Sequence, residues 1–445
     1  MTDAALAADD TRSAAAPPRG AIAFIFITVL INMIGFGVVM PVMPDLVMEV
    51  TGVGRGEAAR WGGYLTVVYA AMQFVMSPVL GALSDRFGRR PVTLGSLIAY
   101  AFDFLLMALA PTFALLFVAR AFAGAFAATF TTASAYIADV SPPNKRAANF
   151  GLIGAAFGLG CIIGPVVGGL VGDAYGHRAP FFVVAALGAA NFLFGLIALP
   201  ETLAADKRRA FDWRRANVFG NFAQLGKLPS ILPIAFSMFL FQIGHWAFPS
   251  VWAYYAGVKF GWPPSEIAYS LAAVGLAAAI VQGGGTRLIV PKIGERAAAF
   301  LGLAIACFVY PAYGLATAGW MIYALIPIGA FVGLAAPALQ GVMSARVPAD
   351  AQGELQGAIA SVNGLSMIVG PIVVTQIFAA FTQAEGPVMI GPFEVSADGA
   401  PIYFPGAPYV FAGALAAVSM LPLFGALRGV ARADDAVSAG PQPAA

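Results

Sequence analysis

The sequence predicts an all-α integral membrane protein, with twelve transmembrane helices in two pseudo-symmetric halves of six helices each. Three observations lead to this fold class: the shortage of charge, the number of long apolar runs, and a repeat between the two halves of the chain. Hydrophobic residues make up 60% of the 445 residues and charged residues only 10%, whereas soluble domains usually carry about 25% charged residues. We therefore expect lipid to surround most of the chain.

Twelve segments are apolar over a length that can cross a bilayer, which takes about 20 residues of helix. They begin near residues 21, 61, 92, 113, 149, 179, 229, 266, 297, 319, 355 and 406. The third and fourth spans are separated by little more than Pro111 and Thr112, so we expect a tight hairpin. The predicted organisation is a disordered tail at 1–20, a first half at 21–199, a linker at 200–228, a second half at 229–428 and a disordered tail at 429–445.

The positive charges predict the orientation of these spans, because cytoplasmic loops carry an excess of Lys and Arg. With the N-terminus inside, 19 Lys and Arg residues fall in cytoplasmic segments and 4 in external ones. The tail at 1–20 has no apolar stretch of the kind found in a cleaved signal peptide. We expect a multi-pass protein of the inner (cytoplasmic) membrane with both termini in the cytoplasm.

An internal repeat relates the two halves at an offset of 206 residues. Gly151–Pro165 (GLIGAAFGLGCIIGP) and Gly357–Pro371 (GAIASVNGLSMIVGP) are identical at seven of fifteen positions. The same offset aligns the loops that follow the second span of each half: Arg86, Gly88 and Arg90 with Lys292, Gly294 and Arg296. A six-plus-six repeat is typical of transporters whose two halves move about a central binding site.

Other classes of function lack their sequence signals. The spacing of the cysteines and histidines does not match a metal site; these residues are Cys161, Cys307, His177 and His245. A net charge of +2 gives no sign of a nucleic-acid surface, and no nucleotide-binding loop or clustered nucleophile is present. We expect no enzymatic activity, no metal and no cofactor; the expected partners are the lipid bilayer and a small molecule, not nucleic acid.

Two short strings carry most of the functional information. The loop after the second span reads GALSDRFGRRP from Gly81 to Pro91, and its glycines permit a tight turn between helices. The fifth span contains GCIIGPVVGG, whose small residues and proline permit close helix contact and a kink. The residues that define this second string are Gly160, Gly164, Pro165, Gly168 and Gly169.

The first string resembles the signature of the major facilitator superfamily, and the second resembles the motif that marks proton antiporters within it. Arg120 and Gly124 in the fourth span are similar to the family's third motif. Further strings resemble the bacterial tetracycline/proton antiporters: Asn32–Pro44, Tyr136–Asp139, Phe260–Trp262, Gly294–Arg296 and Pro337–Gln340. The resemblance implies the major facilitator fold and export of a small amphipathic compound or drug in exchange for protons, by alternating access. We expect the exporter to be a monomer.

The chain also departs from the tetracycline/proton antiporters. That branch has acidic residues in spans one and nine and a histidine in span eight, where this chain has Asn32, Ala306 and Ala278. The acid of span three is retained as Asp103 and the glutamine of span two as Gln73. Transport of tetracycline itself therefore does not follow from the resemblance.

Asp103 and Arg120 are charged residues inside predicted spans, where charge is costly. Each lies 8.5 residues from the centre of the turn between spans three and four, which places both at one depth, roughly 13 Å from the turn. Asp103 could exchange protons as Arg120 approaches and withdraws, because burial favours a neutral acid and a nearby cation favours the ionised form. Alternatively, the two residues stay paired and only neutralise each other.

Asp85, Arg89 and Asp139 lie at the predicted cytoplasmic face. The family resemblance implies that they form an ion-pair lock, which holds one conformation and breaks in the other. The alternative is a surface salt bridge that contributes little to stability.

Several polar or aromatic residues within the spans are candidates for contact with the substrate: Asn32, Gln73, Gln242, His245 and Trp246. His245 is also a proton-coupling candidate, since histidine ordinarily titrates near neutral pH; a hydrogen-bonded role in the cavity is the alternative. Trp246, Trp252 and Tyr254 could offer aromatic faces to a flat substrate or anchor the protein at the membrane interface.

Two other functions stay open at this point. The chain could carry a metabolite such as a sugar, or it could be a transporter-like sensor that binds its ligand without moving it. The string in the fifth span argues against a symporter. A sensor would be expected to carry a sizeable soluble signalling domain, which this sequence does not contain.

Overall fold

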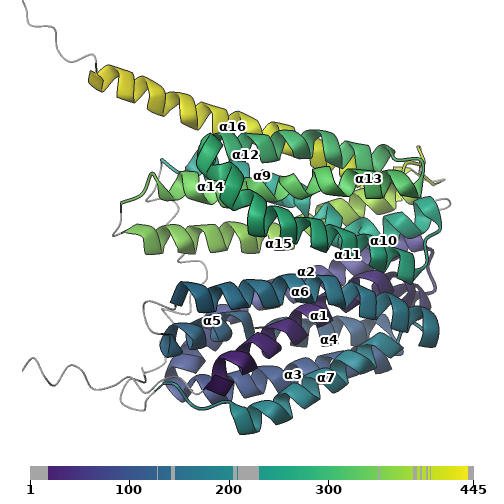
Figure 1. The fold of residues 1–445 in the computed structure, drawn as a ribbon. Coiled ribbons are helices and arrows are strands. Elements are labelled where there is room, and N and C mark those ends of the chain that lie inside the picture. The colour runs from purple at the N-terminus through teal and green to yellow at the C-terminus, as the bar shows by residue number, and fades with distance from the viewer. Residues whose placement is uncertain are drawn as a thin grey trace, which may run out of the picture.

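The computed structural model describes residues 19–127, 129–141, 146–203, 208, 230–348, 351–383, 388–390, 393–396, 399–400 and 402–438. These residues form two helical bundles that lie one above the other in Figure 1. The first bundle contains α1 (Arg19–Thr51), α2 (Arg55–Phe87), α3 (Arg89–Leu109), α4 (Phe113–Phe126), α5 (Thr129–Val140), α6 (Arg146–Tyr175) and α7 (Ala179–Ala198). The second contains α9 (Leu232–His245), α10 (Ala247–Phe260), α11 (Pro264–Ile280), η2 (Val281–Gly285), α12 (Thr286–Leu315), α13 (Gly319–Gly329), η3 (Ala330–Leu334), α14 (Ala335–Ser344), α15 (Gln352–Thr382) and α16 (Ala407–Ser438).

Ten helical stretches in the described part of the chain are long and apolar enough to cross a membrane. One of them, Pro264–Leu315, traverses the bundle twice, because the backbone leaves the helical conformation at Gly294 with φ 79°. A further traverse is made by α4 and α5 together, which are too short to count singly. The twelve predicted spans are thereby accounted for, and each begins close to its predicted residue.

Six glycines with positive φ reveal the repeat in the backbone. They occupy the loops after the first, second and fifth traverses of each half: Gly52, Gly88 and Gly176 in the first half, and Gly261, Gly294 and Gly399 in the second. Positive φ is open to glycine without a steric penalty. Gly88 and Gly294 are the pair that the sequence aligns at an offset of 206 residues.

Two regions differ from the sequence prediction. Residues 429–438 were expected in a disordered tail, but they continue α16 as far as Ser438; this segment contains several alanines, which favour helix. A two-stranded antiparallel hairpin, β1 (Val388–Ile390) and β2 (Phe393–Ser396), stands between α15 and α16, where no strand was expected. Residues 1–18 and 439–445, and most of the expected linker at 200–228, lie outside the described residues.

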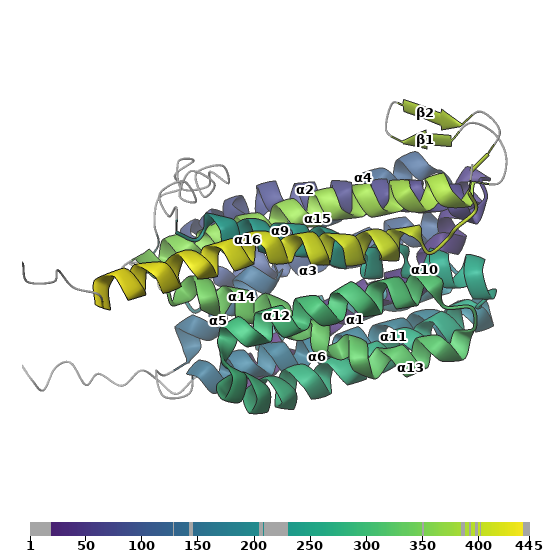
Figure 2. The same ribbon diagram turned by 90° about the horizontal axis from the view of Figure 1, so that it is seen from above.

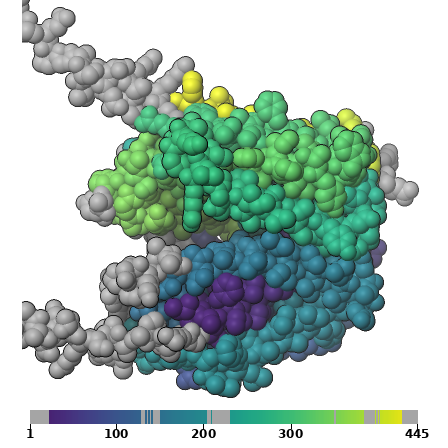
Figure 3. All heavy atoms as spheres, viewed as in Figure 1, coloured from purple at the N-terminus to yellow at the C-terminus, as the bar shows by residue number. Residues whose placement is uncertain are grey.

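The two halves touch at one end of the molecule and separate at the other. We call the end at which α1 begins and α16 finishes the terminal end, and the opposite end, where Figure 2 shows the β hairpin projecting, the distal end. Across the distal interface, Gly56 of α2 lies against Thr382 of α15, and Gly169 of α6 against Pro264 of α11. Figure 3 shows the seam between the halves closed on the right, the distal side, and hollowed further left. The structure is therefore sealed distally and opens towards the terminal end.

Candidate functional site

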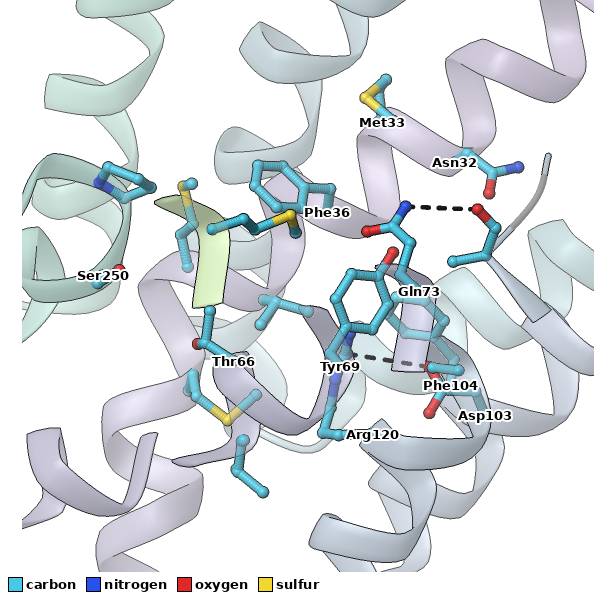
Figure 4. Close-up of a pocket in the computed structure, with 18 of the residues that line it drawn as sticks. Asn32, Met33, Phe36, Thr66, Tyr69, Gln73, Asp103, Phe104, Arg120 and Ser250 are labelled. Atoms are coloured by element: carbon cyan, nitrogen blue, oxygen red, sulfur yellow. Dashed lines mark hydrogen bonds and ion pairs between the residues drawn. The ribbon is translucent and has the colours of Figure 1, made fainter. Parts of the chain in front are cut away.

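A cavity of about 180 Å³ lies among the helices of the first half and reaches the second half at α10. Its lining includes one charged or amide side chain from each of four helices: Asn32 of α1, Gln73 of α2, Asp103 of α3 and Arg120 of α4. Figure 4 shows Asp103, Arg120 and Tyr69 gathered on one side of the cavity and Ser250 on the other. The second half contributes Trp246, Pro249, Ser250, Ala253, Tyr254 and Met367. Substrate-sized molecules bound here would touch both halves.

The charges of the cavity belong to Asp103 and Arg120, the only acidic and basic side chains among its described lining residues. Nη1 of Arg120 lies 3.9 Å from Oδ2 of Asp103 and 3.3 Å from Sδ of Met107. The guanidinium carbon of Arg120 also sits 4.6 Å from the centre of the Tyr69 ring, within the range of a cation–π contact. Arg120 is thus shared among three neighbours, and its contact with the carboxylate is longer than a hydrogen bond.

The cavity has unused hydrogen-bonding capacity. Within the described residues, Oδ1 of Asp103, which is 2% exposed, has no hydrogen-bond partner. The same holds for Oγ of Ser96, Oγ of Ser250 and the Tyr254 hydroxyl, which also line the cavity. Buried polar atoms normally have a partner, so this lining is suited to a bound molecule that carries polar groups of its own.

The hairpin of α3 and α4 sets the positions of Asp103 and Arg120. Thr112 caps α4 by accepting a hydrogen bond from the Leu115 amide at 3.4 Å. Arg178, in the loop before α7, donates to the Ala108 carbonyl at 2.8 Å and to the Ala110 carbonyl at 2.7 Å. It also pairs with Glu49 at the end of α1. Nothing in the sequence marks backbone carbonyl groups as the partners of Arg178.

Asn32 and Gln73 line the cavity while bonded to backbone carbonyls. Asn32 Nδ2 donates to the Thr28 carbonyl at 2.9 Å. Gln73 Nε2 donates to the Ala127 carbonyl at 3.4 Å, at the break between α4 and α5. Both amide nitrogens are engaged, which leaves the amide oxygens to accept hydrogen bonds from a ligand.

Gln242 and His245, two of the predicted substrate contacts, are not among the residues that line this cavity. Gln242 Nε2 donates to Oδ1 of Asn363 at 3.1 Å. His245 Nδ1 lies 2.7 Å from the Tyr310 hydroxyl, and its ring stacks on Phe241. Both side chains make these contacts within the second half.

The sequence leaves two roles open for Trp246, Trp252 and Tyr254: contact with the substrate or anchoring at the membrane interface. The structure separates the three residues. Trp246 and Tyr254 line the cavity, where they can offer aromatic faces. Trp252 is 1% exposed and its Nε1 donates to Ser270 at 2.9 Å. Trp252 is therefore part of the packed core and neither faces the cavity nor anchors the surface.

The three predicted lock residues meet at the terminal end of the first half. Arg89 Nη1 lies 2.7 Å from Asp85 Oδ1, and its Nε lies 3.2 Å from Asp139 Oδ2. Glu201, directly after α7, accepts hydrogen bonds from the amides of Arg89 at 2.8 Å and Arg90 at 3.2 Å. All these partners belong to one half, so in this conformation the cluster does not bridge the opening. Glu201 was not identified from the sequence.

The glycines of the fifth-span string pack against two different helices. A side chain at Gly164 would meet the Ile34 carbonyl, and one at Gly168 the Val38 carbonyl, both on α1; Gly160 lies against α1 as well. Pro165 lies against Gly37 of α1, whereas Gly169 faces Pro264 and Ala268 of α11 in the other half. The close helix contact expected from this string is confirmed.

Comparisons with known proteins agree with this architecture. A family model described as Major Facilitator Superfamily matches residues 25–371. Tetracycline resistance protein, class C, of Escherichia coli is 37% identical over 353 residues, covering 79% of this chain and 88% of that protein. Tetracycline resistance protein, class D, of Salmonella ordonez is 34% identical, with 81% and 90% covered.

Among solved structures, a bacterial homolog to the human lysosomal transporter Spinster, in an inward-facing and unoccupied conformation, superimposes with a TM-score of 0.71. The alignment covers 92% of this chain and 96% of that one, at 18% sequence identity. At this identity the likeness supports the fold alone.

Proposed function

We propose, from the premise that the chain belongs to the major facilitator superfamily, that it exports a small amphipathic compound in exchange for protons. The chain is a multi-pass membrane transporter and not an enzyme, as its family and relatives establish. Proton coupling, the direction of transport and the class of substrate are our proposal. One observation carries it: a loosely paired Asp103 and Arg120 in the wall of the central cavity.

The pair supports proton coupling because each member has an alternative to the ion pair: Asp103 can take up a proton, and Arg120 can keep its contact with the Tyr69 ring. A buried carboxylic acid favours its neutral form, and a nearby cation favours the ionised form. When Arg120 withdraws from Asp103 while it keeps its contact with the Tyr69 ring, Asp103 gains a proton. When Arg120 or a cationic group of the substrate approaches, Asp103 releases it. Proton and substrate then compete for one site, which is the requirement of an antiporter. His245, hydrogen-bonded to Tyr310, is our second candidate for proton coupling.

The conformation supports a cycle of alternating access. With both termini in the cytoplasm, as the loop charges favour, the open terminal end faces the cell interior, where an exporter takes up its substrate. We propose that the cluster of Asp85, Arg89 and Asp139 acts as the conformational lock when the terminal end closes. In the open state its charges are satisfied within the first half. The protein works as a monomer in the inner membrane.

The lining of the cavity favours partly apolar substrates and can accept substrates of different shapes. Met33, Met40, Met43 and Met367 line it together with aromatic rings, and methionine adapts its shape to different ligands. Tetracycline is the first compound to test, because relatives at 34–37% identity are named tetracycline resistance proteins. Asn32 and Ala306 stand where the tetracycline/proton antiporters have acids. We therefore propose small amphipathic compounds in general as substrates, and not that one drug alone.

The test measures proton movement in everted membrane vesicles. Tetracycline is added to vesicles with an acidified lumen, and lumenal pH is followed for the native protein and for Asp103→Asn. Native protein should release lumenal protons on drug addition, and Asp103→Asn should not. Glu354→Gln, which changes an acid in the first turn of α15 outside the cavity, is the matched control and should behave as native. An equal proton response from native protein and Asp103→Asn would exclude Asp103 as the coupling site.

A further inference from the structure

A second, larger hollow lies on the seam between the two halves. This groove, of about 770 Å³, runs between α6 and α11. Apart from the Cys161 thiol and the Gln282 amide, every described side chain that lines it is apolar, and none is charged. A water-filled route for a polar solute would be expected to carry more hydrogen-bonding groups than this, so the groove is suited to an apolar occupant.

The groove covers about one leaflet of the membrane. It begins near the contact between Gly275 of α11 and Ile162 of α6 and extends along α6 to Gly151. At about 1.5 Å per residue, Gly151 and Ile162 are roughly 17 Å apart along the helix. The hydrocarbon core of a bilayer is about 30 Å thick. The groove therefore opens over the half of the bilayer nearer the terminal end, on the face that Figure 3 shows hollowed.

Helix packing does not account for three of the α6 glycines that line this groove. On the face of α6 towards α1, a side chain at Gly160 or Gly164 would collide with its neighbours. On the groove face, a side chain at Gly151, Gly154 or Gly158 would meet nothing within 4 Å. Glycine destabilises a helix interior relative to alanine. These three glycines keep space open instead of allowing close contact.

The groove adjoins the central cavity. Phe36 and Met40 of α1 line both hollows, so these two side chains form the partition between them. Phe36 is 38% exposed and stands at the cavity edge in Figure 4, and a methionine side chain changes rotamer readily. Beyond the partition lies the unpartnered Oδ1 of Asp103.

We propose that this groove is a lateral entrance, by which an amphipathic substrate dissolved in the cytoplasmic leaflet passes into the central cavity. The apolar part of the molecule follows the groove, displaces Phe36 and Met40, and lets the polar part reach Asn32, Gln73 and Asp103. The substrate class is thereby a compound that partitions into membranes. The inference rests on the proposed function and adds the route.

The first test fills the groove. A Cβ at Gly154 or Gly158 meets nothing within 4 Å, so Gly154→Leu and Gly158→Leu direct a side chain into the groove. Gly95→Leu and Gly425→Leu are matched controls, since these helical glycines have equally open surroundings and line neither hollow. Uptake of tetracycline into energised everted vesicles should fall about tenfold in the groove variants and stay native in the controls. Native uptake by both groove variants would overturn the proposal.

The second test needs no transport and therefore separates this inference from the proposed function. In Cys307→Ser protein, Cys161 of the groove is the remaining cysteine; it is labelled with bimane in lipid nanodiscs. Lipids carrying a nitroxide on the acyl chain should quench the label strongly, and aqueous iodide weakly. Quenching by iodide alone would mean a water-filled vestibule and would overturn the lateral entrance. Failure of native protein to move tetracycline, with lipid quenching intact, would count against that drug as substrate and leave the opening to lipid standing.

Discussion

The carboxylate of Asp103 lies 3.9 Å from Nη1 of Arg120, close enough for attraction and too far for a direct hydrogen bond. Asp103 is 2% exposed, so water contributes little to its solvation. Arg120 has the Tyr69 ring as a further partner. The pair is consequently coupled but separable, unlike a bidentate salt bridge that holds both groups in one geometry.

A double-mutant cycle measures the coupling of this pair. Arg120→Gln should lower the melting temperature in detergent, because it leaves a buried carboxylate without its cation; breaking a buried pair costs about 3–5 kcal/mol. Asp103→Asn together with Arg120→Gln should recover much of that loss. The measurement is thermal unfolding of all four proteins at fixed pH and salt. If the loss in the double variant equals the sum of the losses in the two single variants, the two charges do not interact.

Gly88 and Gly294 occupy equivalent positions in the repeat but have different surroundings. Both have positive φ with extended ψ, 107° and 160° at Gly88 and 79° and 159° at Gly294; this region is essentially open to glycine only, so alanine at either position is strained by about 1–3 kcal/mol. At Gly88 the added carbon would also strike the Glu201 carboxylate, whereas at Gly294 it would meet nothing within 4 Å. Gly88→Ala should therefore lower the melting temperature more than Gly294→Ala.

The Glu201 contact can be isolated in the same experiment. Combining Gly88→Ala with Glu201→Ala relieves the collision but not the backbone strain. If the larger effect of Gly88→Ala comes from Glu201, the two substitutions together should destabilise less than the sum of each alone. Simple addition of the two effects would contradict the contact.

The sequence predicts the spans well because their signal is local. Apolar length alone locates the traverse that begins after Gly294, where the backbone leaves the helical conformation between two helical segments. The offset of 206 residues likewise anticipates the shared backbone conformation of Gly88 and Gly294. These features depend on composition and spacing, which the chain displays directly.

The cavity lining is less predictable because it depends on how each helix is rotated about its axis. Asn32 and Gln242 are both polar residues within spans, yet only Asn32 lines the cavity. Gln242 is satisfied by Asn363, which lies 121 residues away in the chain. Such partners are brought together by packing, and no pattern near Gln242 signals them. The same reason hides Glu201, whose partners are backbone amides that every residue carries.

Replacing glycine by alanine should have opposite effects on stability on the two faces of α6. At Gly164 an added carbon would lie 2.5 Å from the Ile34 carbonyl and 2.8 Å from Gly37, so Gly164→Ala should push α1 and α6 apart and destabilise the protein. At Gly151 it would meet open space, so Gly151→Ala should stabilise the helix by about 0.5–1 kcal/mol. Thermal unfolding of both variants checks the sign of each effect. Equal destabilisation by both substitutions would contradict the two-faced packing of α6.

Arg178, near the distal end, holds the turn between α3 and α4, the two helices that carry Asp103 and Arg120. Its two terminal nitrogens hold the carbonyls of Ala108 and Ala110 at the end of α3, and its side chain pairs with Glu49. Arg178→Ala should loosen the α3–α4 turn and reduce both stability and proton-coupled transport. Arg178→Lys should restore little, because an ammonium group lacks the planar fork that reaches two carbonyls at once.

Thermal unfolding and the vesicle proton assay, run on the same preparations, distinguish a local effect from general loss of fold. Lys259→Ala removes a different cation near the distal end of α10 and is the control for charge alone; it should behave as native. If Arg178→Lys restores native transport, the positive charge is what matters and the hydrogen bonds to Ala108 and Ala110 do not position the hairpin. If transport falls in Arg178→Lys while the melting temperature stays close to native, the effect lies in the geometry that this arginine imposes on Asp103 and Arg120.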